Sequence, residues 1–166
     1  MKKLIIIATA ITISGMVHAA TYYVSVINPV GSDSNPGTLA LPWLTITKAA
    51  QSAAAGDIVY IKAGNYGHEH VVVNNSGTSS AWIRFIGYKT TPGDIGTPAW
   101  LDLNQTGGYD PPTTDPAEMP LIDGTKNGVG VGITVSSKSY VEIKNIQVSR
   151  GCLHTRGYRS VWQYNT

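Results

Sequence analysis

Residues 42–66 constrain the fold more than any other part of the sequence, because they place a short amphipathic helix directly before a strand. Ile46, Ala49, Ala50 and Ala53 follow the spacing i, i+3, i+4 and i+7, which puts their apolar side chains on one face of a helix. A helix with one apolar face has to be covered, and the residues that follow suggest a stack of short coils.

The ends of this helix are also marked. Thr45 is placed to cap its start, and Gly56 can supply the left-handed residue that ends it, which predicts a helix over residues 45–55. The β-branched and aromatic run from Ile58 to Ile61 predicts a strand. Gly64-Asn65-Tyr66 then predicts a sharp turn.

Strand-like segments recur along the chain at the length that one coil of a β-solenoid requires. The intervals from Val59 to Ile83, from Ile122 to Ile143 and from Ile143 to Trp162 are similar in length. We therefore expect Val59, Ile83, Ile122 and Ile143 to stack in buried ladders, each branched side chain contributing about 1.5–3 kcal/mol.

A segment rich in proline and glycine interrupts this recurrence at residues 89–120. The density of prolines in it rules out a regular helix and most strand structure. We interpret the segment as a long loop inserted between coils. It could form a wall over a binding groove, or it could be a surface excursion without a ligand.

Residues 21–88 resemble the N-terminal cap and first coil of the right-handed parallel β-helix of the pectate lyase-like superfamily. The resemblance is carried by Tyr22–Ser25, Gly31–Thr38, Pro42-Trp43, Thr45-Ile46, Ala49-Ala50, Gly56–Tyr60 and Gly64–Tyr66. It implies an all-β fold, a right-handed parallel β-helix with an N-terminal capping α-helix. It says less about activity, because lyases, hydrolases, epimerases and non-catalytic solenoids share this fold.

The first nineteen residues have the pattern of a secretory signal. Lys2-Lys3 is followed by an apolar core from Leu4 to Gly15 that is too short to span a membrane, and Val17 and Ala19 fit the small residues before a cleavage site. We expect cleavage after Ala19, a β-helix domain over residues 20–166, and a secreted or periplasmic protein. An uncleaved membrane anchor is the alternative, and no later segment is apolar enough to insert stably.

Charge and cysteine content narrow the possible partners. Removing Lys2 and Lys3 from the 12 basic residues leaves 10, which equals the 10 acidic residues, so the mature chain is formally neutral. This balance argues against nucleic-acid binding, which needs a clustered basic surface. Cys152 has no partner for an internal disulfide and is expected to be a small buried side chain, with a reactive thiol as the alternative.

Two short segments contain groups that metal ions prefer. The loop from Gly31 to Gly37 carries Asp33 and Asn35, which suit a calcium site or a turn held by side-chain-to-backbone hydrogen bonds. His68-Glu69-His70 could present two histidines on one strand face, but two ligands are too few for zinc without a third. We favour the structural interpretation of both segments, and assign no metal-binding residue.

Acid-sugar lyases need a cation or strong donor against the uronate carboxylate and a base for the neighbouring proton. Related enzymes use calcium with aspartates, and lysine or arginine as the base, so calcium would be the cofactor if this chain is a lyase. Asp123, Glu142, Lys144 and Arg150 are the candidates here, but a solvated strand face explains them equally well. We assign no catalytic residue.

Aromatic side chains could stack on sugar rings or belong to the core. The tryptophans are Trp43, Trp82, Trp100 and Trp162, accompanied by nine tyrosines. Trp43 lies in the cap motif and is expected to be packed. Trp100 lies in the proline-rich segment and is the stronger sugar-binding candidate.

The sequence thus predicts an exported protein that acts on or binds polysaccharide, with a non-catalytic adhesion, scaffold or carbohydrate-binding solenoid as the alternative. An enzyme would be a polysaccharide lyase, which cleaves by β-elimination beside a uronate, or otherwise a glycoside hydrolase. No capping segment is recognisable after Ile143, so we expect an incomplete, inactive N-terminal portion that self-associates through its last coil. Light scattering tests the self-association.

Overall fold

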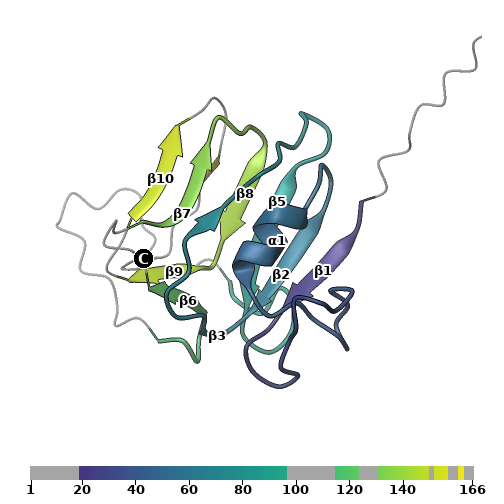
Figure 1. The fold of residues 1–166 in the computed structure, drawn as a ribbon, viewed down its shortest axis with the longest axis vertical. Helices are drawn as coiled ribbons and strands as arrows, with labels where there is room; N and C mark the ends of the chain where they lie inside the picture. The colour runs from purple at the N-terminus through teal and green to yellow at the C-terminus, as the bar shows by residue number, and fades with distance from the viewer. Residues whose placement is uncertain (1–18, 97–114, 124–130, 150–151, 157–160, 163–166) are drawn as a thin grey trace, which may run out of the picture.

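The computed structural model describes residues 19–96, 115–123, 131–149, 152–156 and 161–162 (Figure 1). One helix and eleven strands are found in these residues. They are β1 (Thr21–Val24), α1 (Ile46–Ser52), β2 (Ile58–Lys62), β3 (Gly64–Asn65), β4 (Val71–Val72), β5 (Ile83–Tyr88), β6 (Pro120–Asp123), β7 (Val131–Ser136), β8 (Val141–Lys144), β9 (Gln147–Ser149), β10 (Cys152–Arg156) and β11 (Val161–Trp162).

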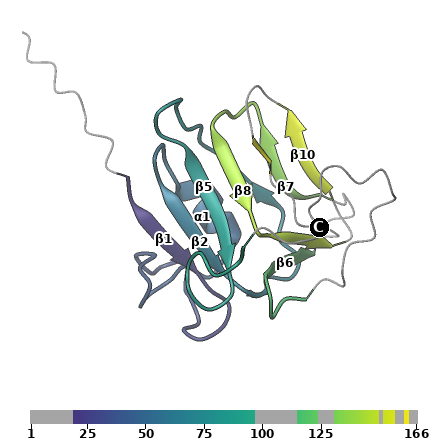
Figure 2. The same ribbon diagram turned by 180° about the vertical axis from the view of Figure 1, so that it is seen from behind.

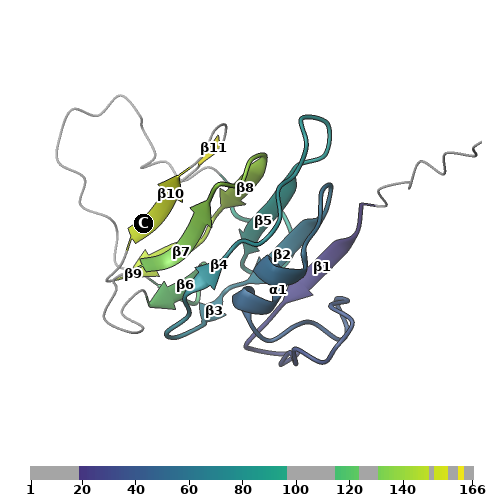
Figure 3. The ribbon, with the colours of Figure 1, turned by 45° about the horizontal axis from the view of Figure 1, so that its top comes forward.

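The strands form three parallel sheets that the chain visits in turn. Sheet A contains β1, β2, β5, β8 and β11, sheet B contains β3, β6 and β9, and sheet C contains β4, β7 and β10. Each passage through sheets A, B and C makes one coil, so β2 to β4, β5 to β7 and β8 to β10 are three successive coils (Figure 3). This is the architecture of a parallel β-helix, as predicted.

The interior is filled by apolar side chains that stack between coils. In sheet A, Val59 pairs with Phe85 and Phe85 with Ile143, and all three side chains are buried. The predicted ladder from Val59 to Ile83 is wrong, because Ile83 pairs with Val141 instead. The repeat between β2 and β5 therefore runs from Val59 to Phe85.

Ile122 also differs from the prediction. It is fully buried, but it lies on β6 in sheet B, where it pairs with Val148 rather than with Ile143. The predicted interval from Ile122 to Ile143 is therefore not a coil. The interval from Ile143 to Trp162 is correct, because these residues pair across β8 and β11.

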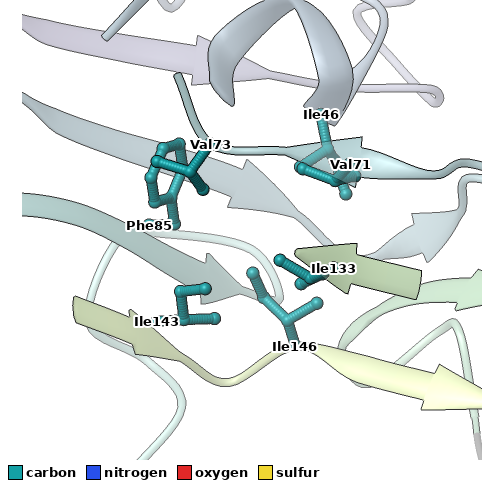
Figure 4. A pocket seen from close by; sticks show the side chains of 7 residues that line it. All are labelled: Ile46, Val71, Val73, Phe85, Ile133, Ile143 and Ile146. Carbon is teal, nitrogen blue, oxygen red and sulfur yellow. The ribbon is translucent and has the colours of Figure 1, made fainter. Parts of the chain in front are cut away.

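The core is dry between sheets A and C, next to helix α1. Figure 4 shows the seven apolar side chains that converge there, and the space between them has no room for a water molecule. They are Ile46, Val71, Val73, Phe85, Ile133, Ile143 and Ile146. This gap belongs to the packed interior and is not a ligand site.

Helix α1 packs its predicted stripe against β1 and β4 (Figure 3). Ile46, Ala49, Ala50 and Ala53 are all buried, and Thr45 accepts a hydrogen bond from the Lys48 N–H as the predicted cap. The helix ends at Ser52, earlier than predicted, and the next residues form the turn before β2.

Two predicted turns are placed differently in the structure. Gly56 has the positive φ of 93° that the sequence suggested, but it uses this in the turn after α1 rather than at the helix end. Gly64 and Asn65 form β3 rather than a turn, because Gly64 pairs with Pro120 and Asn65 with Leu121 of β6. Pro120 is thus the first residue of a strand, and the connection from β5 ends at Met119.

Candidate functional site

The outer face of sheet A carries polar and aromatic side chains because its strands alternate. In β2, Val59 and Ile61 are buried while Ile58, Tyr60 and Lys62 are partly exposed. Parallel pairing places equivalent side chains of β5 and β8 beside them. Figure 2 looks onto this face, with α1 on the far side of the sheet.

Charged groups meet at the middle of this outer face. Glu142 on β8 accepts from Arg84 Nε on β5 at 3.2 Å and from Lys144 Nζ at 2.7 Å. The Glu142 side chain is 17% exposed, whereas Arg84 and Lys144 are 48% and 36% exposed. The cluster therefore holds one carboxylate between two accessible cations and carries a net positive charge.

Tyrosines continue the same face from β1 to β5. The Tyr23 and Tyr60 rings stack with centroids 5.7 Å apart, and Tyr60 meets Tyr88 edge to face at 6.3 Å. Burial raises the pKa of Tyr88, with smaller contributions from Tyr23 and Asp94. Tyr23 and Tyr60 stay partly exposed, so their rings can contact a ligand.

A shallow hollow of about 320 Å³ lies where the strands of sheet A begin. Trp82, Ser80 and Ala81 line one part, and Ile58 and Arg84 join it to the charged cluster. Gly56 and Ala19 complete the lining. Trp82 is partly buried and packs edge to face against Tyr140, with centroids 5.6 Å apart.

The charged residues predicted from the sequence are only partly brought together. Glu142 and Lys144 meet on sheet A, whereas Asp123 lies on β6 in sheet B. The Asp123 side chain and the whole of Arg150 lie outside the described residues. Arg84 was not among the candidates, although its alternation with the buried Ile83 and Phe85 marks it as outward-facing.

Asp33 belongs to a turn that braces the start of α1. Its carboxylate accepts from the N–H groups of Leu44 and Thr45 at 3.0 and 2.9 Å, and from the Thr45 hydroxyl at 2.8 Å. Asn35 donates to the carbonyl of Pro42 at 2.9 Å. The turn interpretation of this loop is therefore the one that the structure supports.

The structural interpretation of His68-Glu69-His70 is the one that the structure supports, and the segment does not form the strand face that the alternative, a metal site, would need. His68 is exposed, whereas Glu69 is buried and its carboxylate accepts from the N–H of Ile46 at 3.2 Å, and from the N–H and hydroxyl of Thr47 at 2.8 and 2.7 Å. His70 Nε2 lies 3.0 Å from the Thr134 hydroxyl. Glu69 is thus a cap for α1 supplied from the segment between β3 and β4.

The structure tests the prediction for Trp43 but not those for Trp100 and Cys152. Trp43 is buried as predicted and stacks on Tyr22 with centroids 4.4 Å apart. Trp100 and the side chains of Cys152 and Trp162 lie outside the described residues. Residues 1–18, which hold nearly all of the predicted signal, also lie outside them.

The described part of the chain has neither a metal-binding cluster nor a membrane-spanning helix. No cluster of three or more histidine, cysteine, aspartate or glutamate side chains there could hold a metal ion. No helix in the same residues has the length and apolar character to cross a bilayer.

The fold and this polar face define a parallel β-helix protein. The chain belongs to the family described as Pel9A-like, right handed beta helix region, which matches residues 22–162. The family match therefore covers every strand but the first residue of β1 and includes both β5 and β8.

Individual relatives are matched over less than a third of their own length. The chain is 43% identical over 63 residues to the uncharacterized protein YwoF of Bacillus subtilis (strain 168), which is 38% of this chain and 13% of that protein. Among solved structures it is similar to a rhamnogalacturonan lyase, with 26% identity, a TM-score of 0.48, and coverage of 78% of this chain and 28% of the lyase. A lacto-N-biosidase from Eubacterium ramulus matches with 16% identity, a TM-score of 0.47, and coverage of 84% and 21%.

Proposed function

We propose that this β-helix protein binds acidic polysaccharide along the outer face of sheet A. The observation that carries the proposal is the cluster of Arg84, Glu142 and Lys144, which offers two accessible cations on the same sheet face as the stacked rings of Tyr23 and Tyr60. Membership of a Pel9A-like family supports a polysaccharide ligand.

The chemistry of the face matches a uronate chain. A sugar carboxylate can replace Glu142 as the partner of Arg84 or Lys144, because both cations are partly exposed. The apolar face of a sugar ring can lie on Tyr60, whose ring adds contact area at a low entropy cost. A neutral polysaccharide would gain the stacking but not the charge pairing, so binding should discriminate between the two.

We propose that the protein binds the polysaccharide without cleaving it. Related enzymes use a lysine or arginine as the base, and the side chains of that type on this face, Arg84 and Lys144, are both held in ion pairs with Glu142. Incubation with pectate, alginate and chondroitin in the presence of calcium, while the absorbance of new double bonds is recorded, tests this directly. A measurable rate of double-bond formation would refute binding without cleavage and would favour a lyase.

The binding test compares two matched variants. Arg84→Gln removes a cation whose side chain is 48% exposed and paired with Glu142. Lys89→Gln is the matched control, because it removes a cation that is also 48% exposed and paired with a glutamate, Glu118, but that lies just beyond the end of β5. Titration calorimetry with polygalacturonate should show affinity about tenfold weaker for Arg84→Gln, and little change for Lys89→Gln. Equal losses would refute a specific role for the cluster.

Stacking has its own test at Tyr60. Tyr60→Ala should weaken binding of both acidic and neutral polysaccharide, whereas Tyr60→Phe keeps the ring and should retain most of the affinity. If Tyr60→Ala binds as the unchanged protein does, the sugar does not lie on β2.

We also propose that the protein is exported and cleaved after Ala19. Lys2-Lys3, the short apolar core and the small residues Val17 and Ala19 support this, and β1 begins shortly afterwards at Thr21. Mass spectrometry of the exported protein should show a chain that begins at Ala20. Retention of Met1 in that fraction would refute cleavage.

A further inference from the structure

A buried carboxylate lies where β1 meets the turn before β2. Asp57 is 4% exposed, and its two side-chain oxygens accept from backbone N–H groups: Oδ2 from Ala54 at 2.8 Å and Oδ1 from Ala20 at 2.9 Å. Within the part of the chain that the structure describes, the ion pairs join Arg84 and Lys144 to Glu142, and Lys89 to Glu118. None of them provides a cation for Asp57.

Such a carboxylate is unusual, because a buried charge is costly unless a cation or several hydrogen bonds compensate it. Two neutral N–H donors compensate it in part. The residue that supplies one of them, Ala20, is also the residue that the proposed cleavage makes first in the chain.

Ala20 is fixed in this position from its other side as well. Its carbonyl accepts from the Ile58 N–H at 2.9 Å, and the next residue, Thr21, pairs with Ile58 in sheet A. The nitrogen that cleavage would release is therefore already held against Asp57 by the pairing of β1 with β2.

We propose that removal of the leader creates an ion pair between the Ala20 α-ammonium and Asp57, which locks β1 onto the first coil. Water adds across the Ala19–Ala20 peptide bond, its hydroxyl going to the Ala19 carbonyl carbon and a proton to the Ala20 nitrogen, which takes a further proton from solvent. The neutral N–H donor becomes a charged one, and charge-assisted hydrogen bonds are about twice as strong as neutral ones.

The inference rests on the proposed cleavage site and gives that site a structural role. With the leader attached, Asp57 faces an amide; after cleavage it faces a cation in the same place. Arg84, whose backbone N–H donates to the Asp57 carbonyl, directs its side chain to Glu142 on β8 and not to the Asp57 carboxylate. The mature chain should therefore be more stable than the same chain with a blocked N-terminus.

The experiment uses the mature chain beginning at Ala20, with its α-amine free or acetylated. Acetylation keeps the N–H donor and removes only the charge, so it isolates the ion pair. At pH 6, urea unfolding should give an unfolding equilibrium constant about tenfold smaller for the free amine, since hydrogen bonds to charged groups are the stronger class. In Asp57→Asn the difference between free and acetylated chains should disappear.

The extra stability of the chain with a free amine should depend on pH, because pairing with Asp57 changes the pKa of the α-amine. An α-amine has a pKa of about 7.7–8.0 in an unfolded chain, and pairing with Asp57 raises it in the folded chain. The advantage of the free amine should be complete below about pH 7.7, and be lost as the pH rises through the folded-state pKa.

Three results would overturn the inference. These are equal stabilities of the free and acetylated chains, a difference that persists in Asp57→Asn, and an α-amine pKa in the folded protein that is not raised. The last is measured by NMR on the unchanged sequence, so it decides the matter even if Asp57→Asn does not fold. N-terminal mass spectrometry of the exported protein tests the cleavage separately, so a failure of processing is distinguishable from a failure of the ion pair.

Discussion

Removal of the Glu69 carboxylate should destabilise the protein strongly, although no catalytic or binding role is assigned to it. Helix α1 has no acidic residue in its first turn, and Glu69 supplies that charge from the segment between β3 and β4. Negative charge at a helix N-terminus is favourable because the unpaired N–H groups point there.

The magnitude can be worked from the three hydrogen bonds. In Glu69→Ala the N–H of Ile46, a residue that is 1% exposed, loses its acceptor in a place that water reaches poorly. An orphaned buried donor costs about 1–3 kcal/mol. The N–H and hydroxyl of Thr47 are partly buried and cost less, so the total loss should be about 3 kcal/mol.

Urea unfolding and thermal melts measure this loss. For a chain of this size, about 3 kcal/mol corresponds to a fall in Tm of about 6–12 °C. Glu69→Gln keeps one acceptor oxygen and should lose roughly half as much. Glu118→Ala is the control, because it removes an exposed glutamate paired with Lys89 and should barely move the midpoint. A loss below about 1 kcal/mol for Glu69→Ala, at an unchanged slope in urea, would refute the capping role.

Two further outcomes follow from the structure. Ala50→Asp places an unpaired carboxylate at a position that is 1% exposed, so it should lower the free energy of unfolding by at least about 3 kcal/mol or prevent folding. A thermal melt measures this loss, and an unchanged Tm would contradict the placement of α1. Burial raises the pKa of Asp94, but hydrogen bonds from the N–H groups of Thr91, Lys89 and Thr90 outweigh it and lower the pKa overall. The stabilisation by this turn should therefore be present above the ordinary carboxyl pKa and be lost as the pH falls through the folded-state value, which an NMR titration of the Asp94 carboxyl can check.

Sequence reasoning succeeded where the determining interactions are local. The stripe of Ile46, Ala49 and Ala50 follows from helical geometry, and the strand from Ile58 follows from side-chain type, so both were predictable. The register in which the strands pair was not predictable in this way. The recurrence of strand-like segments placed Val59 opposite Ile83, whereas the parallel pairing of β2 with β5 places it opposite Phe85.

The interactions that build the candidate site are long-range, which explains why they were harder to see. Arg84 and Glu142 are remote from each other in the sequence, and only the assembled sheet brings them to 3.2 Å. Glu69 was grouped with its histidine neighbours, because the helix end that it caps is also remote in the chain. A polar residue in an otherwise apolar strand was the available signal for Arg84.

The connection from β5 to β6 divides the strands of the solenoid into two groups. Strands up to β5 pair over short stretches of sequence, as β2 does with β5, and strands from β6 onward do likewise, as β7 does with β10. Pairs that bridge the connection enclose a much longer stretch, as β5 does with β8 and β4 with β7. Closing the longer span costs only about 1 kcal/mol more than closing the shorter one.

The middle coil is therefore shared, with β5 contributed by the first half and β6 and β7 by the second. Residues 89–96 and 115–119 contribute no strand to any sheet. A backbone break within the connection would leave every strand pairing of the three sheets in place. The two halves should consequently behave as complementing fragments, which can be supplied as separate polypeptides and can reassemble through the coil that they hold in common.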